Sequence, residues 1–284
     1  MTDKIIALVD GSIYSKSVCE NAAWIAGRTD AAIELFHVLG RREAAGASDL
    51  SGSIALGART ALLEELSSLD EQRGRLAQKR GRAILDDAEA LLKSSGMETV
   101  TTRLRNGDLL ETVSEFETGA DMIVIGKRGE AADFAKLHLG SNLERIVRAA
   151  KKPIFVVARA FRPIKRVLVA YDGGVSAMKA VDHIARNRLF SGLDITVLSV
   201  GQDTDEGRKR LEDARLTLTA GGHEATTDLV PGQPETVISK KVESEGFDLL
   251  VMGAYGHSRV RSLIIGSTTT EMVRSCKIPI LLFR

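Results

Sequence analysis

Residues 253–268 read GAYGHSRVRSLIIGST, in which two residues separate Gly253 from Gly256 and nine separate Gly256 from Gly266. The stretch follows an apolar run at 247–252 that is typical of a buried strand, and it leads into a predicted helix. Glycines let the backbone approach a ligand closely, and the free N–H groups at a helix start attract anions. The stretch therefore predicts a parallel α/β protein with a phosphate-binding loop.

A second copy of this pattern lies earlier in the chain. An apolar run at 121–125 leads to Gly126 and Gly129, and then to Gly140-Ser141. Ten residues, instead of nine, separate the last two glycines of this copy. The chain is therefore predicted to be a duplication whose two copies are not equivalent.

Matching apolar runs support the duplication. The runs at 4–9 and 166–171 end in Asp-Gly, at Asp10 and Asp172, as expected of a buried strand closed by a turn. Further matched runs lie at 34–38 and 196–200, and at 153–157 and 279–283. Each half thus alternates five strands with helices, which predicts a mostly parallel five-stranded sheet flanked by helices.

We place the boundary between the predicted domains, 1–160 and 161–284, in a short linker at about 158–165. A linker of this length does not let domains tumble freely, so we expect the halves to pack as an intramolecular pseudo-dimer.

The first half carries an insertion at about 41–94. Residues 41–57 are rich in Gly, Ala and Ser and predict a loop, whereas 58–94 predicts a helix about 55 Å long, with Gly74 and Gly81 as points where it could kink or break. Its apolar stripe consists of Leu62, Leu66, Leu69, Leu76, Ala83 and Leu91. Two interpretations stay open: a surface helix that covers its own sheet, or a projecting helix that contacts an oligomer mate or another protein.

Composition excludes several functional classes. The 284 residues are 44% apolar and 27% charged, which is normal for about two soluble globular domains. Lys+Arg is 39 against Asp+Glu of 38, and aromatic residues make up 4%, so we do not expect nucleic-acid binding. No apolar run reaches the roughly 18 residues of a membrane span.

Cysteine and histidine usage indicates a reducing compartment without a metal centre. Cys19 and Cys276 are the two cysteines, and no signal-peptide pattern precedes them, so a cytoplasmic location is expected. The five histidines show no metal-ligand spacing, and no metal-ligating residues are predicted.

With these motifs, the chain resembles a tandem universal stress protein. The resemblance covers both halves apart from the insertion and rests on the strand-end Asp10 and Asp172 together with the two glycine motifs. The spacing Gly-x2-Gly-x9-Gly-Ser/Thr is typical of the ATP-binding branch of that family, and residues 253–267 match it without a gap. The resemblance implies two Rossmann-like domains of the adenine nucleotide alpha hydrolase-like type, with ATP as the ligand.

The resemblance also implies positions for the ligand in the second half. Adenine would lie near Asp172 and Val200, ribose by Gly253, and the phosphates by Gly256, Gly266, Ser267 and Thr268. His257, Arg259 and Arg261 lie in the same loop and could add charge-assisted bonds to phosphate.

A purely structural interpretation of the hydroxyl residues stays open. Thr268-x-x-Glu271 and Ser141-x-x-Glu144 both match the capping box, in which a hydroxyl caps a helix without any ligand. Asp172 could likewise act only as a turn former.

The first half departs from the family pattern. Its corresponding residues are Asp10, Val38, Gly126, Gly129, Gly140 and Ser141. Its longer loop contains Glu130 and Asp133, which oppose a triphosphate, although Lys127, Arg128 and Lys136 counter them. We therefore expect a degenerate or differently loaded site.

Three functional hypotheses follow. The leading one is an ATP-binding, stress-response regulatory protein with nucleotide mainly in the second half, and with Mg²⁺ expected only as the usual companion of a triphosphate. The second is a slow ATPase or adenylyl transferase that uses Asp172 and His257, although the chain has no Walker phosphate loop and no nucleophile elbow. The third is a module that binds a protein or an apolar ligand without nucleotide.

Overall fold

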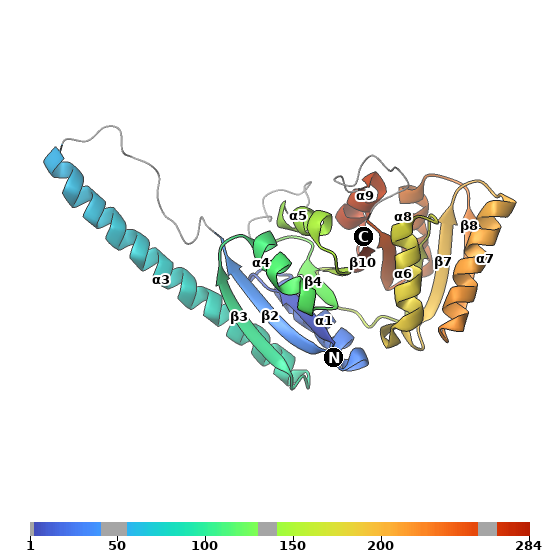
Figure 1. Cartoon of the computed structure of the whole chain (residues 1–284), viewed down its shortest axis with the longest axis horizontal. Coiled ribbons are helices and arrows are strands. Elements are labelled where there is room, and N and C mark those ends of the chain that lie inside the picture. The colour runs from blue at the N-terminus through green and yellow to red at the C-terminus, as the bar shows by residue number, and fades with distance from the viewer. Residues whose placement is uncertain (1–2, 41–55, 130–140, 255–265) are drawn as a thin grey trace.

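The computed structural model describes residues 3–40, 56–129, 141–254 and 266–284. It contains one continuous sheet that runs through both halves of the chain, with helices packed on both of its faces (Figure 1).

Both halves follow the predicted alternation of strands and helices. The first half consists of β1 (Lys4–Leu8), α1 (Ser15–Thr29), β2 (Ala32–Leu39), α3 (Leu56–Ser94), β3 (Val100–Asn106), α4 (Leu109–Phe116), η1 (Glu117–Gly119), β4 (Met122–Gly126), α5 (Ser141–Ala149) and β5 (Ile154–Val157). The second half consists of β6 (Arg166–Ala170), α6 (Val175–Arg186), η3 (Arg188–Phe190), β7 (Asp194–Val200), α7 (Asp205–Ala220), β8 (Ala225–Val230), α8 (Pro234–Glu245), β9 (Leu249–Gly253), α9 (Ser267–Ser275) and β10 (Ile280–Phe283).

The sheet has ten strands in the order β3-β2-β1-β4-β5-β10-β9-β6-β7-β8. All pairs within each half are parallel, which confirms the predicted α/β class. The central strands are buried on both faces, which explains why they read as near-continuous apolar runs.

Two hydrophobic cores lie on the two faces of the sheet. One core packs α1, α3, α6 and α7 against the sheet, and the other packs α4, α5, α8 and α9. Each core contains residues of both halves, so neither face is divided at the linker. The two halves pack against each other, as the short linker predicts.

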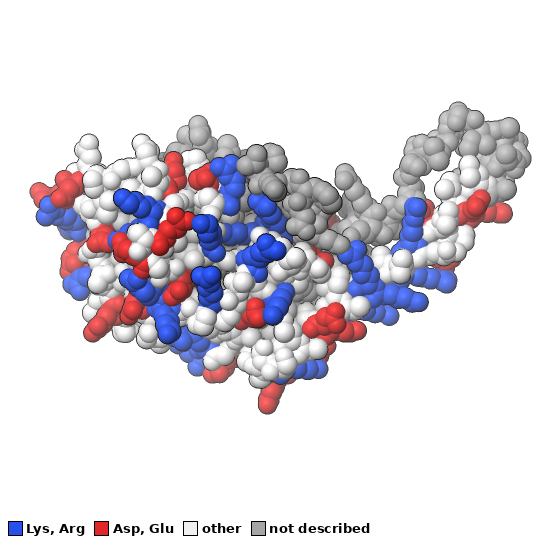
Figure 2. Space-filling model, turned by 180° about the vertical axis from the view of Figure 1, so that it is seen from behind, with Lys and Arg blue, Asp and Glu red and all other residues white. Residues whose placement is uncertain are grey.

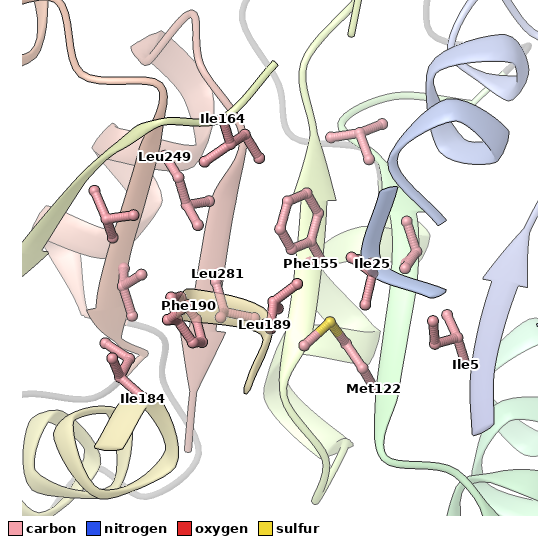
Figure 3. Packing of buried hydrophobic residues seen from close by; sticks show 14 of the residues in the cluster. Ile5, Ile25, Met122, Phe155, Ile164, Ile184, Leu189, Phe190, Leu249 and Leu281 are labelled. Atoms are coloured by element: carbon pink, nitrogen blue, oxygen red, sulfur yellow. The ribbon is translucent and has the colours of Figure 1, made fainter. Parts of the chain in front are cut away.

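The halves join through β5 and β10, which pair antiparallel with Phe155 opposite Leu281. Phe155 has no exposed surface, and Figure 3 shows it beside Leu281 and Leu189 of the second half and near Ile25 of the first. We call this junction between β5 and β10 the seam. A charged side chain contacts the other half beside it: Arg28 Nε donates to the Leu189 carbonyl at 2.7 Å. The seam is therefore a packed interior and not a wet surface contact.

Within the insertion, residues 56–94 form one unbroken helix of 39 residues, so the break that Gly74 and Gly81 would allow does not occur. Gly81 instead lets the helix approach the sheet: a Cβ there would lie 2.7 Å from Leu104 Cδ1 and 2.9 Å from His37 Cδ2. The C-terminal part of α3 covers β2 and β3, and its N-terminal part extends well past the sheet (Figure 1).

No helix in the described ranges is both long enough and apolar enough to cross a lipid bilayer.

Truncating Phe155 tests whether the seam holds the two halves in one folding unit. We expect Phe155→Ala to lower the free energy of unfolding by about 3–5 kcal/mol, the usual cost of a large buried aromatic. Leu216→Ala, at a side chain that is 50% exposed, serves as the control and should change it by under about 0.5 kcal/mol. Urea unfolding followed by circular dichroism measures both, and an unchanged midpoint for Phe155→Ala would contradict the packed seam.

Candidate functional site

A cavity of about 230 Å³ opens at the carboxyl ends of β6, β7 and β9, next to the start of α9. Its lining includes six of the residues predicted for the second half: Asp172, Val200, Gly253, Gly266, Ser267 and Thr268. The strand ends and the helix start therefore converge on one hollow. Gly256, His257, Arg259 and Arg261 lie outside the described residues.

Asp172 directly follows β6 and shapes the turn into α6. Its Oδ1 accepts a hydrogen bond from the Gly174 N–H at 2.8 Å, while Gly173 adopts a φ of +73°. The turn-forming role is thus real. It also fixes the carboxylate at the rim of the cavity, so the turn and a ligand-facing position occur together.

The start of α9 supplies backbone donors to the cavity. Gly266 is the N-cap, its carbonyl accepts from the Thr270 N–H at 2.9 Å, and no side chain caps the helix. The first N–H groups of a helix have no partner within it, and here they belong to Ser267, Thr268 and Thr269, which all line the cavity.

The capping-box interpretation of Thr268 and Glu271 is wrong. Thr268 lies inside the helix and not at its N-cap, and Glu271 pairs with Arg274 one turn later. Gly266, which has no side chain, takes the place of a hydroxyl cap.

Gly253 ends β9 under the first turn of α6. A Cβ at Gly253 would lie 2.9 Å from Ser176 Cβ and 3.2 Å from the Ala177 backbone nitrogen. A glycine is therefore required here by packing alone. Thr269 Oγ1 donates to the Gly253 carbonyl at 3.1 Å and so ties the start of α9 to this strand end.

The apolar part of the lining was not predicted from the sequence. It consists of Ala170, Tyr171, Leu198, Pro234, Ile238 and Met252, together with Thr269. Burial raises the pKa of the Tyr171 phenol, which therefore stays protonated at neutral pH. The sequence did carry a signal for these apolar lining residues. Successive side chains of a strand point to opposite faces, so residues just before the turn that ends a buried strand face either the core or the cavity.

The corresponding residues of the first half are arranged differently. Asp10 and Gly129 lie together, since a Cβ on Gly129 would be 2.8 Å from Asp10 Oδ2. Gly126 lies under Tyr14, where the second half has the smaller Ser176. Val38 is half-buried near the end of β2.

Two further predicted positions of the first half have no described surroundings. Gly140 lies outside the described residues, and Ser141 begins α5.

Comparison with known proteins identifies the family and the fold. A sequence model of the universal stress protein family matches residues 1–158 and 201–284. The chain belongs to the universal stress protein family. It is similar to universal stress protein Slr1230 of Synechocystis sp., with 36% identity over 284 residues that cover 99% of both chains.

More distant relatives of this universal stress protein also match it over 99% of its length. A universal stress protein of Mycolicibacterium smegmatis is 25% identical, with 99% of this chain and 96% of that protein covered. The crystal structure of a universal stress protein from Archaeoglobus fulgidus shares the fold, with a TM-score of 0.71 at 20% identity over 99% of this chain and 96% of that one.

Lys127 of this universal stress protein contacts the end of a helix in the other repeat. It is buried, and its Nζ donates to the Cys276 carbonyl just after α9 of the other repeat. A cation is favourable at the carbonyl end of a helix. Burial nevertheless lowers the pKa of Lys127 to about 8.

A reciprocal contact runs in the other direction. Arg284 Nη1, beyond β10, donates to the Ala149 carbonyl at the end of α5 at 3.2 Å. Each repeat therefore places a cation at the C-terminal end of the other repeat's last helix.

In the described part of the chain, no group of three or more His, Cys, Asp or Glu side chains could hold a metal ion.

The buried Lys127 predicts a rise in stability at alkaline pH. Because its pKa is about 8 in the folded state and near 10.5 when unfolded, the unfolded chain binds more protons between these values, so folding stability increases with pH there. We expect the stability of the wild type relative to Lys127→Met to rise by up to about 3 kcal/mol between pH 8 and 10.5. Chemical unfolding of both proteins at matched pH measures this difference, and a flat difference would refute the buried state of Lys127.

Proposed function

We propose that this universal stress protein binds an adenine nucleotide, ATP first of all, in the cavity of its second repeat and acts as a regulatory protein. The observation that carries the proposal is the convergence of Asp172, Val200, Gly253 and the start of α9 on one cavity.

The two sides of the cavity suit the two ends of a nucleotide. The apolar side chains of Val200, Ile238 and Met252 offer a surface for the flat purine ring. The Asp172 carboxylate at the rim can accept a hydrogen bond from an amino or hydroxyl group of the ligand. The backbone N–H groups of Ser267 and Thr268, with their hydroxyls, suit phosphate oxygens.

The size of the cavity is compatible with the nucleoside part of the ligand. At about 230 Å³ it is smaller than the roughly 300–1,000 Å³ of complete small-molecule sites. We therefore place the base and ribose inside, and the phosphates at the start of α9. A magnesium ion would be carried by the triphosphate, because Asp172 supplies the one carboxylate among the described residues of the lining.

Nucleotide occupancy would be transmitted along α9. Its first residues line the cavity, and the carbonyl that follows its last residue accepts from Lys127 of the first repeat. A shift of this nine-residue helix would therefore reach the other repeat directly. We also propose a cytoplasmic location, where the free, buried Cys19 and Cys276 would stay reduced.

The proposal predicts about one adenine nucleotide per chain. Purified protein is denatured, and the released small molecules are identified by chromatography and mass spectrometry. Protein that emerges empty is titrated with ATP, ADP, AMP and cAMP by calorimetry. Release of two nucleotides per chain would contradict the expected difference between the two repeats. If no nucleotide is released and none binds in the titration, the proposal is wrong.

Gly266→Val tests the site directly. The backbone at Gly266, with φ −58° and ψ 146°, admits a side chain, so the variant should fold, but its new methyl groups would obstruct the start of α9. We expect ATP affinity to fall at least tenfold, about 1.4 kcal/mol. Gly27→Val, at a helix position where a Cβ meets nothing within 4 Å, is the control and should bind as the wild type does. Equal affinities of the two variants would contradict the assignment.

A further inference from the structure

Among the residues of α3 whose side chains are described, none before Gly81 is fully buried. Within the part of α3 whose side chains are described, the fully buried positions are Gly81, Leu85, Ala88 and Leu92, all in the C-terminal part. The preceding turns extend past the edge strand β3 (Figure 1). A helix in water gains most of its stability from packing an apolar face, so these turns are the least supported part of the helix.

An apolar stripe nevertheless runs along these turns. Leu62, Leu66, Leu69, Leu76 and Ala83 follow one another at intervals of three, four and seven residues, the spacing of a coiled-coil seam. Leu69 is 43% exposed and Leu76 is 67% exposed. The stripe lies about 125° around the helix from the buried positions, given roughly 100° per residue. It is therefore a second apolar face, distinct from the one that packs on the sheet.

Charge is divided between the two halves of this segment. The outer half carries Glu64, Glu65, Asp70 and Glu71, and the inner half carries Arg73, Arg75, Lys79, Arg80 and Arg82. Figure 2 shows acidic side chains towards the tip of the helix and basic ones between the tip and the body. The pairs Arg73–Asp70 and Arg75–Glu71 join the two halves within the helix, but such exposed pairs contribute little stability.

We propose that α3 pairs antiparallel with α3 of a second copy of this chain, with the axis of symmetry near Gln72. In this arrangement the acidic half of each helix faces the basic half of the other. Glu65 and Lys79 each lie seven residues from Gln72, so they come opposite each other across the dimer. Leu69 and Leu76 meet in the centre of the seam.

The distribution of charge selects a second copy as the partner. A helix with opposite charges at its two ends is complementary to itself only when it is reversed, which is the arrangement that a twofold axis produces. The same axis explains the cations inside the stripe, because Arg73 and Arg80 then face acidic residues of the other helix. Parallel pairing would instead place like charges together.

Two substitutions in the seam test the pairing. Multi-angle light scattering and sedimentation equilibrium on the full chain should give about twice the chain mass of 30.6 kDa. Leu69→Asp with Leu76→Asp should give the single-chain mass, with circular dichroism and the unfolding midpoint of the body retained. Leu216→Asp, at a leucine on α7 that is 50% exposed, is the control and should stay dimeric. A wild-type protein that stays monomeric at about 100 µM would overturn the proposal, because a specific pair of useful affinity forms at or below about that concentration.

Exchanging the charges tests the partner. A chain with lysine at Glu64, Glu65, Asp70 and Glu71, and another with glutamate at Arg73, Arg75, Lys79, Arg80 and Arg82, should each be monomeric. Mixing the two should restore a one-to-one dimer, and failure to do so would overturn the self-complementary seam.

Cross-linking tests the orientation. A Glu65→Cys chain should form a disulfide with a Lys79→Cys chain and not with another copy of itself. The opposite result would establish parallel pairing and refute the antiparallel dimer. The native Cys19 and Cys276 are buried and should stay silent. Nucleotide binding is measured on the same variants, so a loss of pairing with unchanged binding separates this proposal from the proposed function.

Discussion

The antiparallel pairing of β5 with β10 determines how the rest of the structure is arranged. Because β5 is parallel to β4 and β10 is parallel to β9, this one reversed pair turns the strands of one repeat against those of the other. The carboxyl ends of the strands, where ligands bind in open α/β sheets, therefore emerge at opposite edges on the two sides of the seam. The carboxyl end of each repeat's sheet lies beside the end of the other repeat's last helix. The contacts of Lys127 and Arg284 across the seam follow directly from this geometry.

Strong local patterns were sufficient to predict the repeats, the strands and the parallel sheet. Runs such as 247–252 are buried on both faces, so their apolar character survives in any context. Predictions from local sequence rules were wrong where tertiary packing determined the structure. Gly74 and Gly81 weaken a helix by propensity, yet α3 continues through both, and Gly81 serves as the close contact with the sheet. Thr268 and Glu271 have the capping-box spacing, yet the helix starts one residue before Thr268.

The candidate site likewise combines residues that the local sequence predicts with residues whose contacts depend on tertiary packing. Asp172, Ser267 and Thr268 could be predicted because each stands at a strand end or a helix start that the local sequence defines. Lys127 could not be placed in this way, because its partner carbonyl at Cys276 is 149 residues away and leaves no local signal. The pairing of Tyr14 with Gly126 could have been found, since an alignment of the two repeats sets Tyr14 against Ser176. A bulky residue at that position indicates that the first repeat has changed beside its strand end.

Duplication within one chain allows these changes to be unequal. In a dimer of identical chains, a substitution such as Ser to Tyr at the start of α1 would alter both sites, whereas here it alters one. The second repeat has its cavity at a strand end where the small Ser176 lies beside Gly253, whereas the first repeat has Tyr14 and a buried Lys127 next to its glycines. The insertion lies on that same altered repeat, at the edge of the sheet farthest from the cavity of the second. A long helix attached there can change its contacts without disturbing α9, because five strands (β2, β1, β4, β5 and β10) lie between the edge strand β3 and β9, to which the start of α9 is bonded.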